Sequence, residues 1–241
     1  MSNDLYEQEA LVAQYLLLHY GRADEVLPYP FGPLNALDFP VRCVSQLLDP
    51  DRLPASPRAL DLGCAVGRST FELSKVVGPA TGIDFSSAFI QAAETIRTEG
   101  RLEYHYPLEG DIRARGVAAR PAEVNPSNLE FQVGDALNLP ESCNNHVVVL
   151  AANLLCRLPD PGRFLPRLPS LVAPGGQLLL TTPWTWLEEF TPKQNWIGGT
   201  PGHPCGFDQL RERLAAHFEL DGTLDLPFLI REHARKFQWS V

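Results

Sequence analysis

Residues 60–67 read Leu60-Asp61-Leu62-Gly63-Cys64-Ala65-Val66-Gly67, and they indicate the fold more clearly than any other stretch of the chain. The apolar run that ends at Leu62 predicts a short buried strand, and a helical pattern begins at about Thr70. Two glycines lie between them. A strand, a glycine turn and a helix in this order are typical of the first unit of an open α/β sheet. In such sheets, ligands bind beyond the carboxyl ends of the strands.

The same alternation continues on the C-terminal side of this unit. Further strands are predicted at 81–85, 128–133, 146–152 and 177–182. Helices are predicted at 70–77, at 86–100 and at 207–216, and two more strands in the tail at 218–226 and 234–241. Strands that alternate with helices predict an α/β fold of the Rossmann-like kind, with a mostly parallel seven-stranded sheet covered on both faces.

The remaining segments are predicted to be additions to a single domain that spans residues 1–241. Residues 1–55 are expected to form an N-terminal helical addition, with an amphipathic helix at 5–19 and a second short helix at 39–48. Two long stretches, 103–127 and 183–206, are rich in proline and glycine and are expected to be inserted loops. The second contains three tryptophans, which favours an ordered loop.

Composition excludes several classes of protein. A net charge of −9 argues against general affinity for nucleic acid or anionic membrane, because phosphate binding needs a positive field. The start is polar and resembles no secretory signal, and the longest apolar run, 147–155, is too short to span a bilayer. Five cysteines without a C-x-x-C pair predict reduced thiols and no metal site. We therefore expect a cytoplasmic protein without metal.

The glycine turn has the form D-x-G-x-x-x-G. Gly63 and Gly67 would let the backbone approach a ligand closely. A dinucleotide fingerprint needs a second glycine where Ala65 stands, and Asp61 suits a cationic ammonium better than a pyrophosphate. The segment resembles motif I of class I methyltransferases, which implies S-adenosylmethionine as cofactor, bound by the whole loop including Cys64.

The next two strand ends carry carboxylates in the expected order. Asp84, followed by Phe85 and Ser86, lies about 20 residues beyond the glycines, where an acidic residue accepts hydrogen bonds from ribose hydroxyls. A charge at a helix N-terminus is the alternative interpretation. The pair Asp135 and Ala136 follows the third strand, and in class I methyltransferases an aspartate here faces adenine. An ordinary turn aspartate is the alternative.

The fourth strand ends in a polar residue, Asn153, within an apolar run. Burying its amide unpaired would cost about 1–3 kcal/mol, so we expect a partner, either the ligand or the backbone. We favour the ligand, because this strand end faces the methyl-donor position in the fold.

The chain also resembles a narrower family, the 5-thiohistidine (4-mercaptohistidine) N-methyltransferase domain of ovothiol biosynthesis. The matching segments extend over most of the chain: His19-Tyr20-Gly21, 61–74, 83–93, 151–161, 182–192, 196–199 and 231–239. Two features depart from that family. The chain lacks the iron-dependent sulfoxide synthase region, and Asn144-Asn145 stands where an acidic residue leads into the fourth strand. We therefore expect a separate sulfur- or selenium-inserting enzyme as a pathway partner, and a thio- or selenohistidine as substrate.

The resemblance implies roles for particular side chains. Asn153, Tyr20 and His19 would orient the imidazole as catalytic residues, and Trp184 and Trp186 would wall the pocket. The substrate carboxylate would be bound by basic residues near the C-terminus, since arginine binds carboxylates bidentately. These substrate-binding candidates are Arg231, His233, Arg235 and Lys236. The alternatives are a class I methyltransferase of another small molecule and a non-catalytic module that binds S-adenosylmethionine or S-adenosylhomocysteine.

Overall fold

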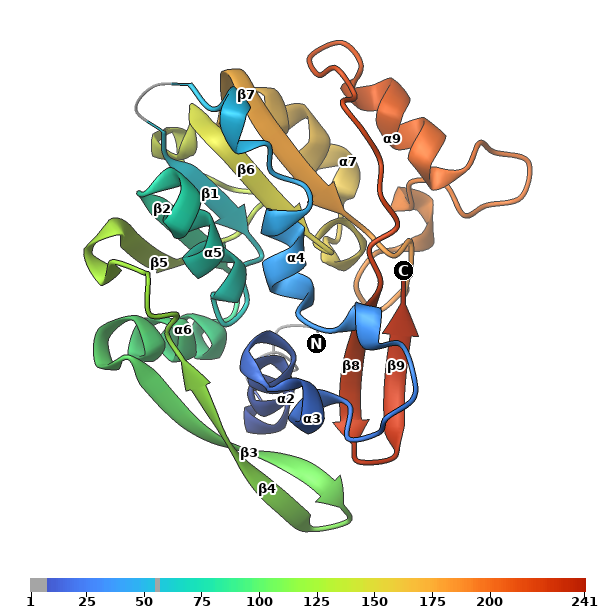
Figure 1. The fold of residues 1–241 in the computed structure, drawn as a ribbon. Helices are drawn as coiled ribbons and strands as arrows, with labels where there is room; N and C mark the ends of the chain where they lie inside the picture. The colour runs from blue at the N-terminus through green and yellow to red at the C-terminus, as the bar shows by residue number, and fades with distance from the viewer. Residues whose placement is uncertain (1–7, 55–56) are drawn as a thin grey trace.

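The computed structural model describes residues 8–54 and 57–241, and a five-stranded parallel sheet lies at its centre (Figure 1). All five strands predicted before the tail are confirmed. In order across the sheet they are β5 (Leu129–Val133), β2 (Ala80–Asp84), β1 (Ala59–Leu62), β6 (His146–Ala152) and β7 (Val172–Thr181). Since the strands are parallel, their carboxyl ends lie at one edge.

Alternate residues of the central strands enter opposite cores. On β6, Val148 and Leu150 join one apolar cluster, while Val149 and Ala151 join the other. Every residue of β1 is buried. This is the pattern of a strand covered on both faces, and it explains the continuous apolar runs in the sequence.

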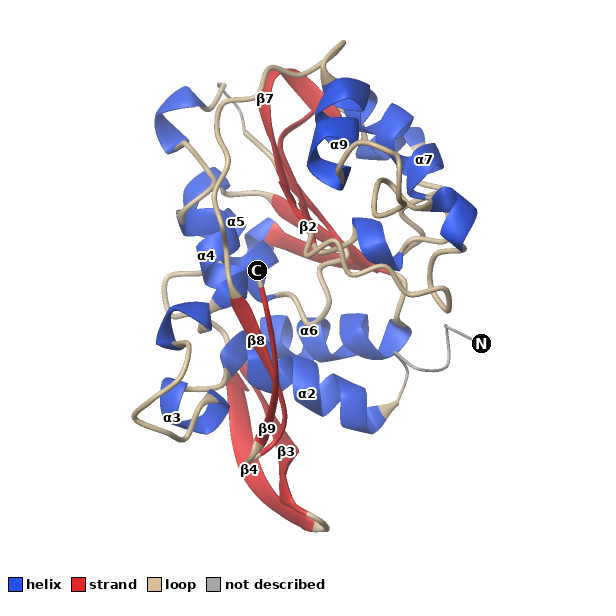
Figure 2. Ribbon diagram, turned by 90° about the vertical axis from the view of Figure 1, so that its right-hand side faces the viewer, coloured by secondary structure: helices blue, strands red, loops and turns tan. Residues whose placement is uncertain are grey.

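Helices cover both faces of the sheet, with α4 and α5 on one side and α7 and α9 on the other (Figure 2). The helices after the first two strands are α5 (Arg68–Val77) and α6 (Ser87–Glu99). Ser86 caps α6 by accepting a 3.1 Å hydrogen bond from the Phe89 N–H, and Gly100 ends it with φ of 82°, so α6 lies within the predicted range 86–100. On the other face lie α7 (Pro161–Phe164), α8 (Leu168–Leu171) and α9 (Gly206–Leu214).

The N-terminal region is helical, as expected. It contains α2 (Glu9–Tyr20), α3 (Ala23–Val26) and α4 (Phe39–Ser45). Residues 5–7 of the predicted first helix, and residue 55, lie outside the described residues. No helix in the described ranges is both long and apolar enough to cross a membrane.

The prediction of an inserted loop at 103–127 is wrong for most of that segment. Residues 101–119 form an antiparallel hairpin of β3 (Arg101–Glu109) and β4 (Ile112–Ala119). Tyr104 and Tyr106 alternate with exposed residues and are buried, which is the two-residue period of a half-buried strand. Pro107 lies where the register shifts, and Gly116 leaves room for the Tyr104 ring, so both residues mark irregularities within strands.

The predicted tail strands are wrong in part. Residues 218–226 form no strand, because Leu220 and Leu224 stay more than half exposed and Asp221-Gly222 favours a turn. The tail hairpin consists instead of β8 (Phe228–His233), which was missed, and β9 (Lys236–Ser240), which lies within a predicted strand. Within the described ranges this hairpin pairs with neither edge of the main sheet, so the central sheet has five strands there and not the predicted seven.

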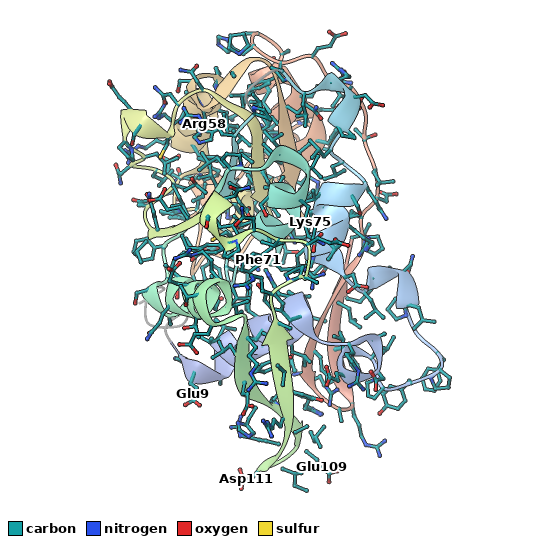
Figure 3. The ribbon with its side chains drawn as sticks, turned by 60° about the vertical axis from the view of Figure 1, so that its left-hand side comes forward. Glu9, Arg58, Phe71, Lys75, Glu109 and Asp111 are labelled. Atoms are coloured by element: carbon teal, nitrogen blue, oxygen red, sulfur yellow. The ribbon has the colours of Figure 1, made fainter. Side chains whose placement is uncertain are left out.

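The two hairpins flank α2 beneath the carboxyl ends of the sheet strands (Figure 1). Figure 3 places Glu109 and Asp111, at the turn of the first hairpin, at the far tip of the molecule. The second hairpin points the same way, and the backbone N–H of Ala234 in its turn donates to the Leu108 carbonyl at 3.0 Å. The segment predicted as a loop, 183–206, has no strand and one short helical turn, Lys193–Asn195, before α9 begins at Gly206.

Candidate active site

The glycine loop after β1 is built from left-handed backbone. Gly63, Ala65 and Gly67 have φ of 71°, 47° and 85°, and Gly67 caps α5. A Cβ at Gly63 would lie 3.0 Å from the Leu154 side chain, and one at Gly67 would lie 2.7 Å from the Phe131 ring. The space that we expected to serve a ligand at these two glycines is therefore filled by neighbouring side chains, and glycine is required there by φ and by packing.

Asp61 lies beneath this loop and is almost fully buried, with 1% of its surface exposed. One carboxylate oxygen, Oδ2, accepts hydrogen bonds from the hydroxyls of Ser69 and Thr70, both at 2.7 Å. The other, Oδ1, is buried and has no partner among the described residues. Burial raises the pKa of Asp61 to about 6, although the two hydroxyls act to lower it. Asp61 Oδ1 is therefore an unpaired, buried hydrogen-bond acceptor, which suits a cationic group of a ligand.

Asp84 connects the loop after β1 to the loop after β2 by hydrogen bonds. Its carboxylate accepts from the Ala65 N–H and from the Ser86 N–H, both at 2.9 Å. The following ring, Phe85, is 52% exposed and offers a flat apolar surface beside the carboxylate. These features suit a ribose and an attached base, and they also stabilise the turn into α6.

Asp135, after β5, stabilises its own turn. Its carboxylate accepts a 2.9 Å hydrogen bond from the Leu137 N–H and a second one from the side-chain amide of Asn138. Ala136 beside it is buried. The alternative interpretation, a turn aspartate, therefore describes the geometry of this residue, and contact with a base would be an additional role.

Asn153 has a protein partner, Thr181, whereas the sequence favoured the ligand. Its φ is 53°, its side-chain oxygen accepts from the Thr181 hydroxyl at 3.0 Å, and its N–H donates to the Thr181 carbonyl at 3.0 Å. The loop after β6 is thus fastened to the end of β7, while Leu154 packs on Gly63.

His19 and Tyr20, at the C-terminal end of α2, contact the glycine loop. The Tyr20 hydroxyl donates to the Val66 carbonyl at 2.8 Å, and Arg68 donates to the His19 carbonyl at 3.4 Å. The ring nitrogen Nδ1 of His19 is buried without a partner among the described residues. Burial and the nearby Arg68 hold the pKa of His19 at about 3, so its imidazole is neutral at physiological pH.

The tryptophan loop, residues 182–206, follows the carboxyl end of β7. Trp184 has a φ of 53° and packs on Gly206, where a Cβ would lie 2.4 Å from its ring. Trp186 stacks on Trp196 with ring centroids 6.3 Å apart, and its Nε1 is buried without a partner among the described residues. Both rings are therefore ordered parts of a packed loop.

Sequence reasoning missed Arg157, which joins the loop after β6 to the tryptophan loop through a 3.4 Å hydrogen bond to the Thr185 carbonyl. The available indication was a basic residue in the segment directly after the fourth strand, within the stretch that carries the family resemblance.

The basic C-terminal residues are not brought to the strand ends. Arg231 is 4% exposed, donates to the backbone carbonyls of Glu25 and Pro107, and lies over the Tyr106 ring. Lys236 pairs with Glu232 at 2.7 Å. With His233 and the exposed Arg235, Lys236 adjoins the β8–β9 turn, which Figure 1 places at the end of that hairpin remote from the sheet. A hairpin that packs against α2 carries these residues away from the site.

Comparison with known proteins identifies the family of this chain. Residues 55–217, more than half of the chain, match the family model described as "Methyltransferase domain". The chain belongs to the methyltransferase domain family. It thus carries a methyltransferase domain of the S-adenosylmethionine-dependent kind.

Individual relatives are distant. The "Ubiquinone biosynthesis O-methyltransferase" of Coxiella burnetii (strain Dugway 5J108-111) is 26% identical over 123 residues, which cover 51% of this chain and 42% of that protein. The enzyme of the same name from Xanthomonas axonopodis pv. citri (strain 306) is 26% identical over 155 residues, covering 64% and 53%. The chain thus spans about half the length of the curated relatives it matches. Among solved structures, the "[4+2]-Cyclase SpnF" has a TM-score of 0.44 at 20% identity, covering 69% of this chain and 53% of that one.

Proposed function

We propose that this methyltransferase domain transfers a methyl group to an imidazole nitrogen of 5-thiohistidine or of its selenium analogue. The observation that carries the proposal is that His19 and Tyr20, at the end of α2 that contacts the glycine loop, are both uncharged. His19 has a pKa of about 3, and burial raises the pKa of Tyr20 well above its usual value. Neither side chain removes a proton readily at physiological pH. The pair therefore suits a nucleophile that brings its own lone pair, as an imidazole nitrogen does.

The residues at the strand ends fit S-adenosylmethionine, which supplies an electrophilic methyl group on a sulfonium. We assign its ammonium to Asp61, whose Oδ1 lacks a partner among the described residues, and its ribose to Asp84. The base would lie along Phe85, near Asp135 and Ala136. Gly63, Cys64, Ala65 and Gly67 form the floor of this site. Burial raises the pKa of the Cys64 thiol, so this thiol stays protonated and does not compete as a nucleophile.

For the acceptor, the protein's task is orientation, because the sulfur of a thioimidazole is intrinsically more nucleophilic than its ring nitrogens. Unpaired Nδ1 of His19 can hydrogen-bond the ring edge, with Tyr20 fixed beside it through Val66. Trp184 and Trp186 would form the opposite wall. As the new N–C bond forms, the S–C bond breaks with its electron pair on sulfur, and the methylated ring, now cationic, loses the proton of its other nitrogen to solvent.

The test is mass spectrometry of 5-thiohistidine incubated with the protein and S-adenosylmethionine, with histidine as the matched acceptor without sulfur. We expect a gain of one methyl, located on ring nitrogen by fragmentation, and a much slower reaction with histidine. Methylation on sulfur, or no reaction with either the thio- or the selenohistidine, would contradict the proposal. Supply of this substrate requires a reaction that inserts sulfur or selenium into histidine, and we assign that reaction to a pathway partner.

A second candidate is methyl transfer to the oxygen of another small molecule, since the curated relatives are named as O-methyltransferases. A phenolic acceptor needs a base for its proton, and His19 and Tyr20 supply none. A phenolic acceptor in the same assay distinguishes the two candidates. Binding of S-adenosylhomocysteine without turnover of any acceptor would favour a non-catalytic module.

A further inference from the structure

Arg157 occupies the junction of the two loops that face the acceptor. It ends the short helical turn Leu155–Arg157, which follows directly on the loop after β6. That loop contacts β7 through Thr181 and the glycine loop through Leu154. Arg157 itself reaches the tryptophan loop at the Thr185 carbonyl. Its guanidinium therefore lies beside the carboxyl ends of β6 and β7, next to the proposed acceptor pocket.

The guanidinium is held firmly but only on one edge. It lies over the Phe190 ring at 4.8 Å from the centroid, and its Nη1 also donates to the Cys156 carbonyl at 3.1 Å. Within the described ranges, Nε and Nη2 make no hydrogen bond and no carboxylate pairs with this side chain. The free Nε–Nη2 edge has the fork geometry that matches the two oxygens of a carboxylate.

Other cations near the site already have partners or lie elsewhere. Arg68 pairs with Glu72 at 2.8 Å, and Arg231 is buried against backbone carbonyls of other elements. Lys193 is exposed on the Trp196 ring, 5.6 Å from the centroid, and so lies on the outside of the tryptophan loop.

We infer that Arg157 binds the α-carboxylate of the acceptor through Nε and Nη2, in place of the C-terminal basic residues. This inference rests on the proposed function and narrows it. The acceptor is a free α-amino acid, and the corresponding amine and peptide-internal residues are poor acceptors.

Calorimetric titration of the complex with S-adenosylhomocysteine tests the inference by binding alone. The probes are 5-thiohistidine and its decarboxylated analogue, 5-thiohistamine, and the proteins are wild type, Arg157→Gln, Arg157→Lys and the matched control Lys193→Gln. We expect Arg157→Gln to weaken 5-thiohistidine binding about 10- to 100-fold, as loss of charge-assisted hydrogen bonds does. Binding of 5-thiohistamine and of S-adenosylhomocysteine should stay unchanged, and Lys193→Gln should resemble wild type.

The Arg157→Lys variant keeps the charge and removes the fork, so it should bind 5-thiohistidine with intermediate affinity and serves if the glutamine variant fails to fold. The inference would be overturned if the variants lost affinity equally for 5-thiohistidine and 5-thiohistamine, or if neither Arg157→Gln nor Arg157→Lys lost affinity for 5-thiohistidine. Either result would leave the proposed function intact. If wild type binds and methylates neither probe, the proposed function fails and takes this inference with it.

Discussion

At the scale of single residues, Asp61 combines two hydroxyl partners on one oxygen with none on the other among the described residues. A buried carboxylate in this arrangement is costly when ionised, and burial accordingly raises its pKa from 3.8 to about 6. An ammonium brought by the cofactor would favour the charged form. Cofactor binding and ionisation of Asp61 are therefore expected to be coupled.

This coupling predicts a pH dependence of affinity. Below about pH 6 Asp61 is protonated, so the Kd of S-adenosylhomocysteine should rise up to tenfold per pH unit. In Asp61→Asn, affinity at pH 7.5 should be lower and this dependence should flatten. The free energy of unfolding at pH 7.5 should not fall, because the variant removes a buried charge worth about 3 kcal/mol of ionisation cost. Calorimetry from pH 5 to 8 measures the first effect and urea unfolding the second; an unchanged slope in Asp61→Asn would refute the assignment.

At the scale of secondary-structure elements, the sequence predicted those helices and strands whose formation depends on neighbouring residues in the chain. The predicted helix at 86–100 contains α6, which Ser86 and Gly100 cap, and the apolar runs predicted the five sheet strands. The β3–β4 hairpin was missed because Pro107 and Gly116 are typical of loops, and only burial against α2 makes the alternation of Tyr104 and Tyr106 decisive.

Substitution of two tyrosines tests which hydroxyl contacts stabilise α2 and the β3–β4 hairpin. The Tyr20 hydroxyl donates to Val66, whereas the Tyr104 hydroxyl is buried with no partner among the described residues. We expect Tyr20→Phe to lower the free energy of unfolding by about 1 kcal/mol and to weaken S-adenosylhomocysteine binding. Tyr104→Phe removes an unsatisfied polar group and should be neutral or stabilising. Denaturant unfolding and calorimetry of the pair measure both effects, and equal losses in the two variants would show that the Val66 contact is unimportant.

At the scale of the whole molecule, the site draws on segments far apart in the chain, such as Tyr20 with Val66 and Arg157 with Thr185. Sequence order predicted that the loops after β1 and β2 meet, as the hydrogen bond between Ala65 and Asp84 shows, since successive parallel strands end at one edge. It did not predict where the basic C-terminal residues lie, because nothing local indicates that β8–β9 forms its own sheet, with Arg235 and Lys236 at its turn. Arg157 was missed for the same reason, because its candidate role depends on its position between two loops that lie apart in the sequence.

Buried histidines on separate elements make stability depend on pH. Burial lowers the pKa of His19 to about 3 and that of His146, at the start of β6, to about 4. Both are neutral in the folded protein and take up protons on unfolding below pH 6.5, so stability falls as pH falls from 6.5 towards 4. Each contributes a loss of up to about 3 kcal/mol in this window. Asp61 acts in the opposite sense between pH 6 and 4, because its folded pKa is raised.

The net expectation is a loss of about 3 kcal/mol between pH 6.5 and 4, measured by urea unfolding. His146→Gln removes one of the two histidine contributions and should reduce the loss, whereas Asp61→Asn removes the opposing contribution and should enlarge it. Glutamine keeps a hydrogen-bonding group towards the Cys143 carbonyl, which contacts His146 Nδ1 at 3.0 Å. If both variants lose the same free energy as wild type over this range, ionisation of these buried groups does not control acid stability.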